Sequence, residues 1–165
     1  MGFAWNKLFR TNVIKSNNIR FKEKVIINED VLFVCEYIDA VNSVRVIDDR
    51  LLYYRVNEKG ATLRYKPDII ESNEWFINNL NHITDDHCTL VSEGYYCRVI
   101  RCLSNVAQFY CFHKDFKGNG IKELKAIVAS YPKYNDAIIN VNHSYLTRKQ
   151  KLLLLFLRLS MRKSS

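Results

Sequence analysis

The spacing of apolar side chains predicts helices over most of the chain. Residues 4–18 fit an amphipathic helix that ends at the pair Asn17-Asn18. The apolar positions of this segment are Trp5, Leu8, Phe9, Val13 and Ile14. Beyond Pro67 the helical spacing continues almost without a break. We expect four helices there, over 68–83, 92–114, 120–131 and 146–163.

Two of the predicted helices have a clear buried face. The segment 92–114 carries the longest apolar face, formed by Tyr95, Tyr96, Val99, Ile100, Leu103, Val106, Ala107 and Tyr110. A further helix is expected from Glu29 to about Val41, with Asn28 as its N-cap residue. The buried positions predicted for this helix are Leu32, Phe33, Cys35, Tyr37 and Ile38.

Three shorter segments favour extended backbone. Residues 19–27 alternate and end in a short apolar run. Residues 43–48 and 51–56 are rich in β-branched and aromatic side chains, and they predict two short strands, or one strand and an extended arm. Five glycines and two prolines are too few for a turn-rich all-β fold. We therefore expect a mixed α/β class that is mostly helical, with a mixed part over 1–66 and a helical part over 67–165.

Charge adds a preference for anionic partners. The chain has 25 Lys and Arg against 17 Asp and Glu, a net charge of +8, and no acidic residue follows Asp136. Nucleic acid, anionic lipid and a phosphorylated substrate all fit this balance. The final basic segment, 147–165, can be a core helix with a cationic edge, a helix lying on an anionic membrane, or a nucleic-acid contact.

Cysteine usage and hydropathy suggest the compartment. Five cysteines without a CxxC pair indicate buried thiols in a reducing environment. Cys97 and Cys111 would lie about 21 Å apart along one helix, too far to share a metal. No apolar run reaches the ~20 residues of a membrane span, and no targeting peptide is expected. We expect a cytoplasmic protein, peripheral at the inner face of the membrane if 147–165 binds lipid.

Five short motifs follow one another in the first 66 residues. They are Trp5-Asn6-Lys7-Leu8-Phe9-Arg10, Ile19-Arg20-Phe21, Glu29-Asp30 with Phe33, Tyr53-Tyr54-Arg55, and Thr62. In this order they resemble the second, acceptor-binding half of the catalytic domain of family 2 glycosyltransferases. These bacterial enzymes build capsular, exopolysaccharide and lipopolysaccharide chains. The resemblance implies a GT-A type fold and the inverting transfer of a sugar from a nucleotide-sugar donor to an acceptor hydroxyl.

The resemblance also implies roles for single residues. Asp30 would be the general base that removes the acceptor proton, and Glu29 would orient the acceptor. Trp5 would face a sugar ring, Lys7 would bind substrate, and Arg55 would contact the donor pyrophosphate. The residues alone leave simpler alternatives open. The two carboxylates can complement a helix dipole, Trp5 can be a core residue, and Lys7 and Arg55 can lie in solvent.

The printed sequence has no counterpart of the donor-binding half of such an enzyme. That half carries a D-x-D element for a divalent metal, whereas Asp48-Asp49 lacks this spacing. We therefore expect a fragment, a truncated gene product or one half of a split enzyme that is inactive alone. Mg²⁺ or Mn²⁺, the nucleotide-sugar donor and a carbohydrate or lipid-linked acceptor would bind in the complete enzyme.

Two other classes of function remain open on the sequence alone. A small basic nucleic-acid-binding module would fit the net charge and the many aromatic residues. The aromatic residues fall at core spacings, however, so we do not expect nucleic acid as the partner. A non-catalytic interaction domain that kept the glycosyltransferase core is the other alternative.

Overall fold

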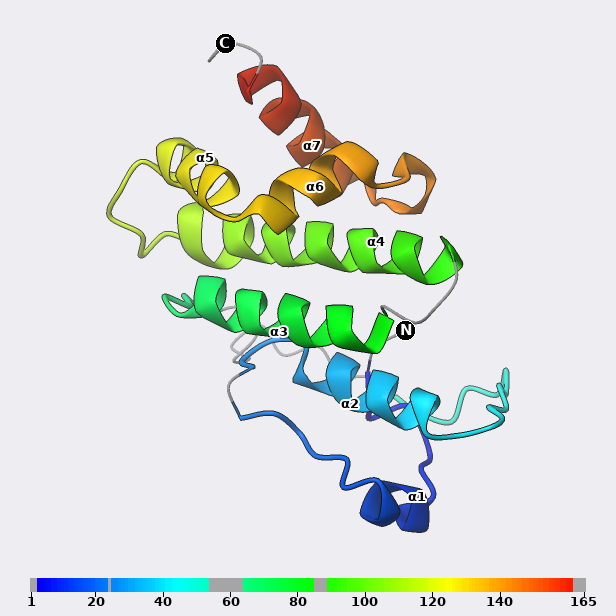
Figure 1. Cartoon of the computed structure of the whole chain (residues 1–165). Helices are drawn as coiled ribbons and strands as arrows, with labels where there is room; N and C mark the ends of the chain where they lie inside the picture. The colour runs from blue at the N-terminus through cyan, green and yellow to red at the C-terminus, as the bar shows by residue number, and fades with distance from the viewer. Residues whose placement is uncertain (1–2, 24, 54–63, 85–88, 162–165) are drawn as a thin grey trace. The chain divides into compact units, whose positions relative to one another are not determined.

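The computed structural model describes residues 3–23, 25–53, 64–84 and 89–161 (Figure 1). These residues are mostly helical, as predicted, and none of them forms a β-strand. The chain divides into two compact units. Unit 1 comprises Met1–Leu63 and Glu71–Asp85, and unit 2 comprises Arg64–Ile70 and Asp86–Ser165. Assigning residues 1–66 to an acceptor-binding half and 67–165 to a helical region stays a prediction.

Unit 1 is built around helix α2 (Glu29–Asp39), together with α1 (Thr11–Ser16) and most of α3 (Ile69–Thr84). A hydrophobic cluster in this unit contains the buried side chains of Ile19, Phe33 and Tyr37. Partly buried side chains pack against it, namely Phe9, Val13, Ile14, Ala40 and Val41. The backbone N–H of Ile26 donates to Ser72 Oγ at 2.9 Å. This bond ties the segment before α2 to α3.

The predicted first helix is wrong over most of its length, because α1 begins only at Thr11. Arg10 has extended backbone, and its N–H donates to the Tyr37 hydroxyl at 2.8 Å instead of continuing a helix. Leu8 is 98% exposed, so the apolar positions before Arg10 do not form one buried stripe. A contact with α2, absent from any local pattern, therefore accompanies the extended backbone at the helix start.

Helix α2 is confirmed, but its buried face is shifted from the predicted one. The buried side chains are those of Val31, Leu32, Phe33, Val34 and Tyr37, whereas Cys35 is half-buried and Ile38 is 50% exposed. Asn28 does precede the helix, but it lies in the left-handed region (φ 74°) and makes no side-chain capping bond. Such caps need extended backbone at this position.

The strands expected within 43–56 are not formed in their described part, residues 43–53. Residues 42–53 are exposed throughout, including Val46 at 74%, Leu51 at 71% and Tyr53 at 95%. A strand exists only when its backbone pairs with another strand. Side chains with strand propensity in this segment therefore lie in solvent, without a sheet to receive them.

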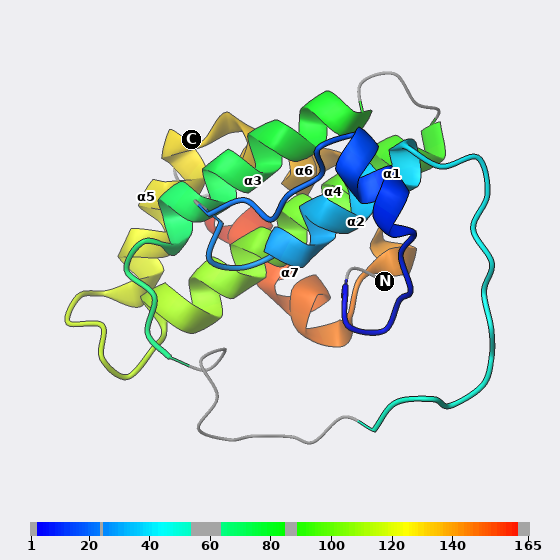
Figure 2. The same ribbon diagram turned by 90° about the horizontal axis from the view of Figure 1, so that it is seen from below.

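Unit 2 is a helical assembly based on the long helix α4 (Thr89–Val106), which continues as the π-helical turn η2 (Ala107–Cys111). Helix α6 (Pro132–Asn140) packs along α4, whereas α5 (Gly120–Ser130) packs against η2 and α6. A 3₁₀ turn, η3 (His143–Tyr145), leads into α7 (Arg148–Met161), which also contacts α4. Figures 1 and 2 show α5 and α6 following each other along α4.

The core of unit 2 is apolar and well covered. Buried side chains from four helices meet in it, among them Val99, Ile100, Leu103, Leu124, Ile138, Leu154 and Leu157, each 0% exposed. Gly120 starts α5 where a Cβ atom would lie 2.2 Å from the Cys111 carbonyl oxygen, so the close approach of η2 requires glycine. The predicted helices at 68–83, 92–114, 120–131 and 146–163 are confirmed within a few residues.

Helix α6 is the element that the sequence reading missed. Its first residue is Pro132, which can be mistaken for a helix breaker but is favourable at the first helical position. None of the helices in the described part of the chain combines the length and the apolar character that crossing a bilayer needs.

Candidate functional site

The first turn of α2 presents two carboxylates, those of Glu29 and Asp30. Both residues are half-buried. Among the described residues, neither carboxylate takes part in a hydrogen bond or an ion pair. Asp30 is therefore held on a regular element, and no described residue occupies its oxygen atoms, an arrangement that suits a general base.

The aromatic residues of three sequence motifs converge beside this helix. Phe33 makes an edge-to-face contact with Phe9, with ring centroids 5.3 Å apart, and a parallel stack with Phe21 at 4.5 Å. Phe9 also meets Tyr37 edge-to-face at 4.8 Å. Residues three apart lie on the same side of a helix, so Asp30 projects from the side of α2 that carries Phe33.

Trp5 lies outside the core of unit 1. Its side chain is 51% exposed, and its ring packs against Phe3 with centroids 5.4 Å apart. The core alternative for Trp5 is therefore wrong, because about half of its side chain is exposed. Phe21, for which the sequence predicted no site role beyond its place in a motif, is a second exposed aromatic residue. It is 53% exposed, and one face of its ring stacks on Phe33.

Lys7 is half-buried rather than free in solvent. Its ammonium group donates to the Phe3 carbonyl at 2.6 Å and to Asn6 Oδ1 at 2.7 Å. An ammonium has three donors, so one remains for a substrate oxygen. The two local bonds also close the turn that contains Trp5.

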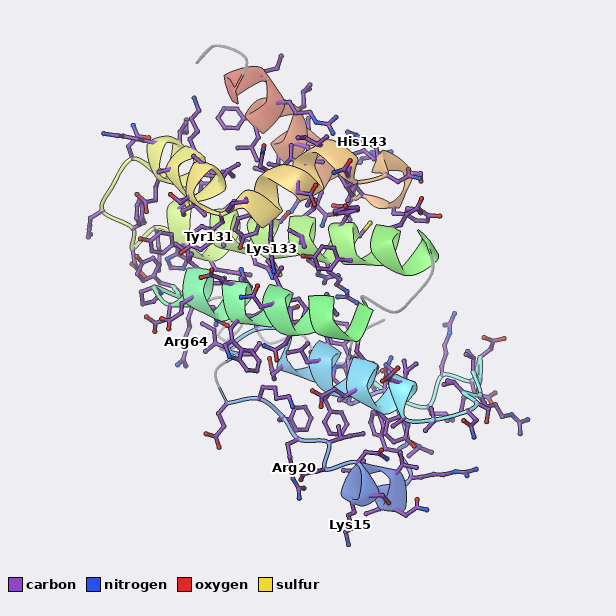
Figure 3. All side chains as sticks on the ribbon, viewed as in Figure 1. Lys15, Arg20, Arg64, Tyr131, Lys133 and His143 are labelled. Atoms are coloured by element: carbon purple, nitrogen blue, oxygen red, sulfur yellow. The ribbon has the colours of Figure 1, made fainter. Side chains whose placement is uncertain are left out.

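The remaining motif residues and the nearby cations are less informative. Tyr54, Arg55 and Thr62 lie outside the described residues, so the predicted pyrophosphate contact of Arg55 stays a prediction. Lys15 and Arg20 point outward from unit 1, away from α2 (Figure 3). Lys22 forms an ion pair with Glu36 at 2.8 Å, which fastens the segment before α2 onto that helix.

Unit 2 contains a separate open groove of about 1040 Å³ between α4, η2 and the start of α7. Its cations are Arg98 and Arg101 of α4 and Lys149 of α7, and its acid is Glu93. No ion pair or hydrogen bond of these three cations is seen among the described residues. Two exposed aromatic side chains, Phe112 and Tyr145, also line the groove. Its charge therefore favours an anion.

Sequence reasoning did not identify this groove. Arg98 and Arg101 are three residues apart on α4, and they lie on the same side of it. That spacing was a usable signal, but no role was predicted for either arginine from the sequence. Only packing of the α7 start against α4 turns the two arginines into the wall of a groove.

Burial suppresses the ionisation of the cysteine thiols in unit 2. The described cysteines, Cys35, Cys97, Cys102 and Cys111, carry thiols rather than disulfides. Burial raises the pKa of Cys102 to about 12 and that of Cys111 to about 11. For Cys97, which lines the groove, burial and then the charge of Glu93 raise the pKa, while Arg98 lowers it.

We expect the Glu93→Gln variant to speed alkylation of Cys97 by iodoacetamide at pH 8 by about two- to fivefold. The reacting species is the thiolate. Because Glu93 raises the pKa of Cys97, removing its charge lowers that pKa and increases the thiolate fraction at pH 8. Peptide mapping by mass spectrometry measures the rate, with buried Cys102 as the slow internal reference. An Asp115→Asn variant is the charge control, and an unchanged rate in Glu93→Gln would contradict the assignment.

No metal site stands out in the described residues. No group of three or more His, Cys, Asp and Glu side chains among them is placed to hold an ion. The donor set for the divalent metal of a complete glycosyltransferase is therefore not found in the described part of the chain.

Comparison with protein-family models, with curated proteins and with solved structures finds no match.

Proposed function

We propose that the chain is the acceptor-binding half of an inverting glycosyltransferase of the family 2 type, with Asp30 as the general base. The observation that supports this proposal is the aromatic cluster of Phe9, Phe21 and Phe33. Each ring comes from a different motif of the resemblance. Three of the motifs therefore contribute to one packing cluster. Asp30 lies on the same side of α2 as that cluster.

The chemistry asked of this site is the activation of an alcohol. The acceptor hydroxyl attacks the anomeric carbon of the donor sugar, and its proton passes to a carboxylate oxygen of Asp30. The bond from the sugar to the nucleotide diphosphate breaks as the new glycosidic bond forms. Positioned proton transfer of this kind contributes about 10²- to 10⁴-fold to a rate. In this proposal Glu29 orients the acceptor, and Trp5 and the remaining donor of Lys7 contact its ring and hydroxyls.

The exposed segment 44–53 supports pairing with a donor-binding half. It carries strand-forming side chains, including Val46, Leu51 and Tyr53, that are mostly solvent-exposed. Exposed apolar segments of this kind mark surfaces that pair with another chain or domain. We propose that the donor-binding half, which would bring the D-x-D element and its metal, pairs with this segment.

The proposal is tested by reconstitution in trans. We expect no sugar transfer or sugar-nucleotide hydrolysis by this chain alone. Mixing it with a separately expressed donor-binding half of a family 2 glycosyltransferase and Mn²⁺ should produce transfer to an oligosaccharide acceptor. The release of nucleoside diphosphate measures this transfer.

Two results would count against the proposal. Clear turnover by this chain alone would show that the second half is not needed. Failure to obtain transfer with a panel of donor halves and nucleotide sugars would remove the functional assignment. A donor half with its D-x-D aspartates changed to asparagine is the control for background hydrolysis.

A further inference from the structure

Helix α7 carries two apolar faces, and only one is used inside unit 2. Leu154 and Leu157 are 0% exposed and belong to the core. A second set of side chains faces solvent and is named here the outer stripe. It consists of Leu152, Leu155, Phe156 and Leu159, which are 66%, 55%, 39% and 54% exposed.

The outer stripe is continuous. Its members are spaced i, i+3, i+4 and i+7, which places them within an arc of roughly 100° along one side of the helix. That side is opposite to Leu154 and Leu157, so the stripe faces away from the buried contacts of α7. Within unit 2, α7 extends beyond α6 toward the C-terminus (Figure 1). Four large apolar side chains left together in water indicate an interaction surface.

Positive charge surrounds the start of the outer stripe. On a helical projection Lys149 and Lys151 fall on either side of it, and Arg148 lies at its beginning. All three side chains are exposed. No Asp or Glu occurs anywhere in residues 137–165. The surface is therefore both apolar and cationic, with no acidic residue in its own segment to neutralise it.

We propose that the outer stripe of α7 docks on an anionic lipid surface. Its leucines would enter the boundary between headgroups and acyl chains, and Arg148, Lys149 and Lys151 would meet lipid phosphates. An amphipathic helix with such a charge pattern lies in the plane of the interface with its apolar face ~5–10 Å deep. The side chain of Arg158 bonds to the Ile138 carbonyl instead, which keeps this cation on the protein side.

Charge complementarity favours lipid over the other occupants. A second copy docked through the same stripe would bring cations of one α7 onto cations of the other, with no acidic partner in the segment. Nucleic acid would satisfy the cations, but its phosphates would leave the leucines without apolar contacts. An anionic bilayer provides both an apolar layer and negative charge.

The test is co-sedimentation of the full chain with two kinds of vesicle. One consists of phosphatidylcholine alone, and the other also contains about 40 mol% of anionic phosphatidylglycerol. We expect binding to the anionic vesicles and little to the neutral ones. Leu155→Glu should lower the partition coefficient by about tenfold or more. Lys149→Gln with Lys151→Gln should lower it by about 25-fold, since each cation near an anionic leaflet contributes roughly fivefold.

The controls separate docking from folding. Ile121→Glu places the same charge on an exposed apolar position of α5 and should leave binding unchanged. Leu152→Glu is a second stripe variant, and circular dichroism checks the helix content of all variants. Equal binding of Leu155→Glu, Leu152→Glu and the parent chain would overturn the proposal. A homodimer in sedimentation equilibrium that dissociates in the Leu155→Glu variant would also overturn the proposal. The proposal does not depend on the glycosyltransferase assignment.

Discussion

Asp30→Asn is expected to slow sugar transfer by the reconstituted enzyme about 10²- to 10⁴-fold, with little change in acceptor KM. Asparagine has the size and shape of aspartate but cannot accept the acceptor proton. The carboxylate of Asp30 has no hydrogen bond or ion pair among the described residues, so the substitution should not disturb the start of α2. Single-turnover kinetics with a saturating donor measure the chemical step.

The matched control for this variant lies on the same helix. Asp39→Asn removes one negative charge from the last residue of α2 and should leave the rate within about twofold. Glu29→Gln should act mainly on acceptor KM if Glu29 orients the acceptor. A rate for Asp30→Asn equal to that of the parent chain would exclude Asp30 as the base. The alternative in which Asp30 only complements the helix dipole predicts this unchanged rate.

Phe33→Ala is expected to destabilise unit 1 by about 3–5 kcal/mol. Phe33 is 6% exposed, and its ring contacts both Phe9 and Phe21. The substitution removes both aromatic contacts and leaves a cavity between α2 and the segments before it. That loss is a large part of the total stability of a small domain. The motifs that the cluster joins should then separate, so reconstituted activity should fall as well.

The position of the tryptophans makes this prediction measurable for unit 1 by itself. Trp5 and Trp75 both belong to unit 1, so tryptophan fluorescence during urea unfolding reports that unit. Circular dichroism follows the helices of both units. Leu8→Ala, at a position 98% exposed, is the control and should change the free energy of unfolding by less than about 0.5 kcal/mol. A Phe33→Ala effect as small as that of Leu8→Ala would contradict the role of the cluster.

The candidate site shows how far sequence patterns reach. The pair Glu29-Asp30 was placed correctly at the start of a helix, because a helix start depends on a few neighbouring residues. The environment of that pair was not predictable in the same way. Phe9 and Phe21 reach Phe33 from positions 24 and 12 residues earlier, and the residue before α1 bonds to a hydroxyl of α2. Contacts at such separations leave no periodic signal.

Sequence by itself determined the long helices of this protein, since an apolar side chain every three or four residues specifies a helix locally. Helices α3, α4, α5 and α7 follow this rule. Tertiary structure decided what local pattern leaves open. It left residues 43–53 without a strand partner, and it chose which of the two apolar faces of α7 is buried and which faces water. Both outcomes depend on which surface is available to pack against, and that is a property of the folded chain.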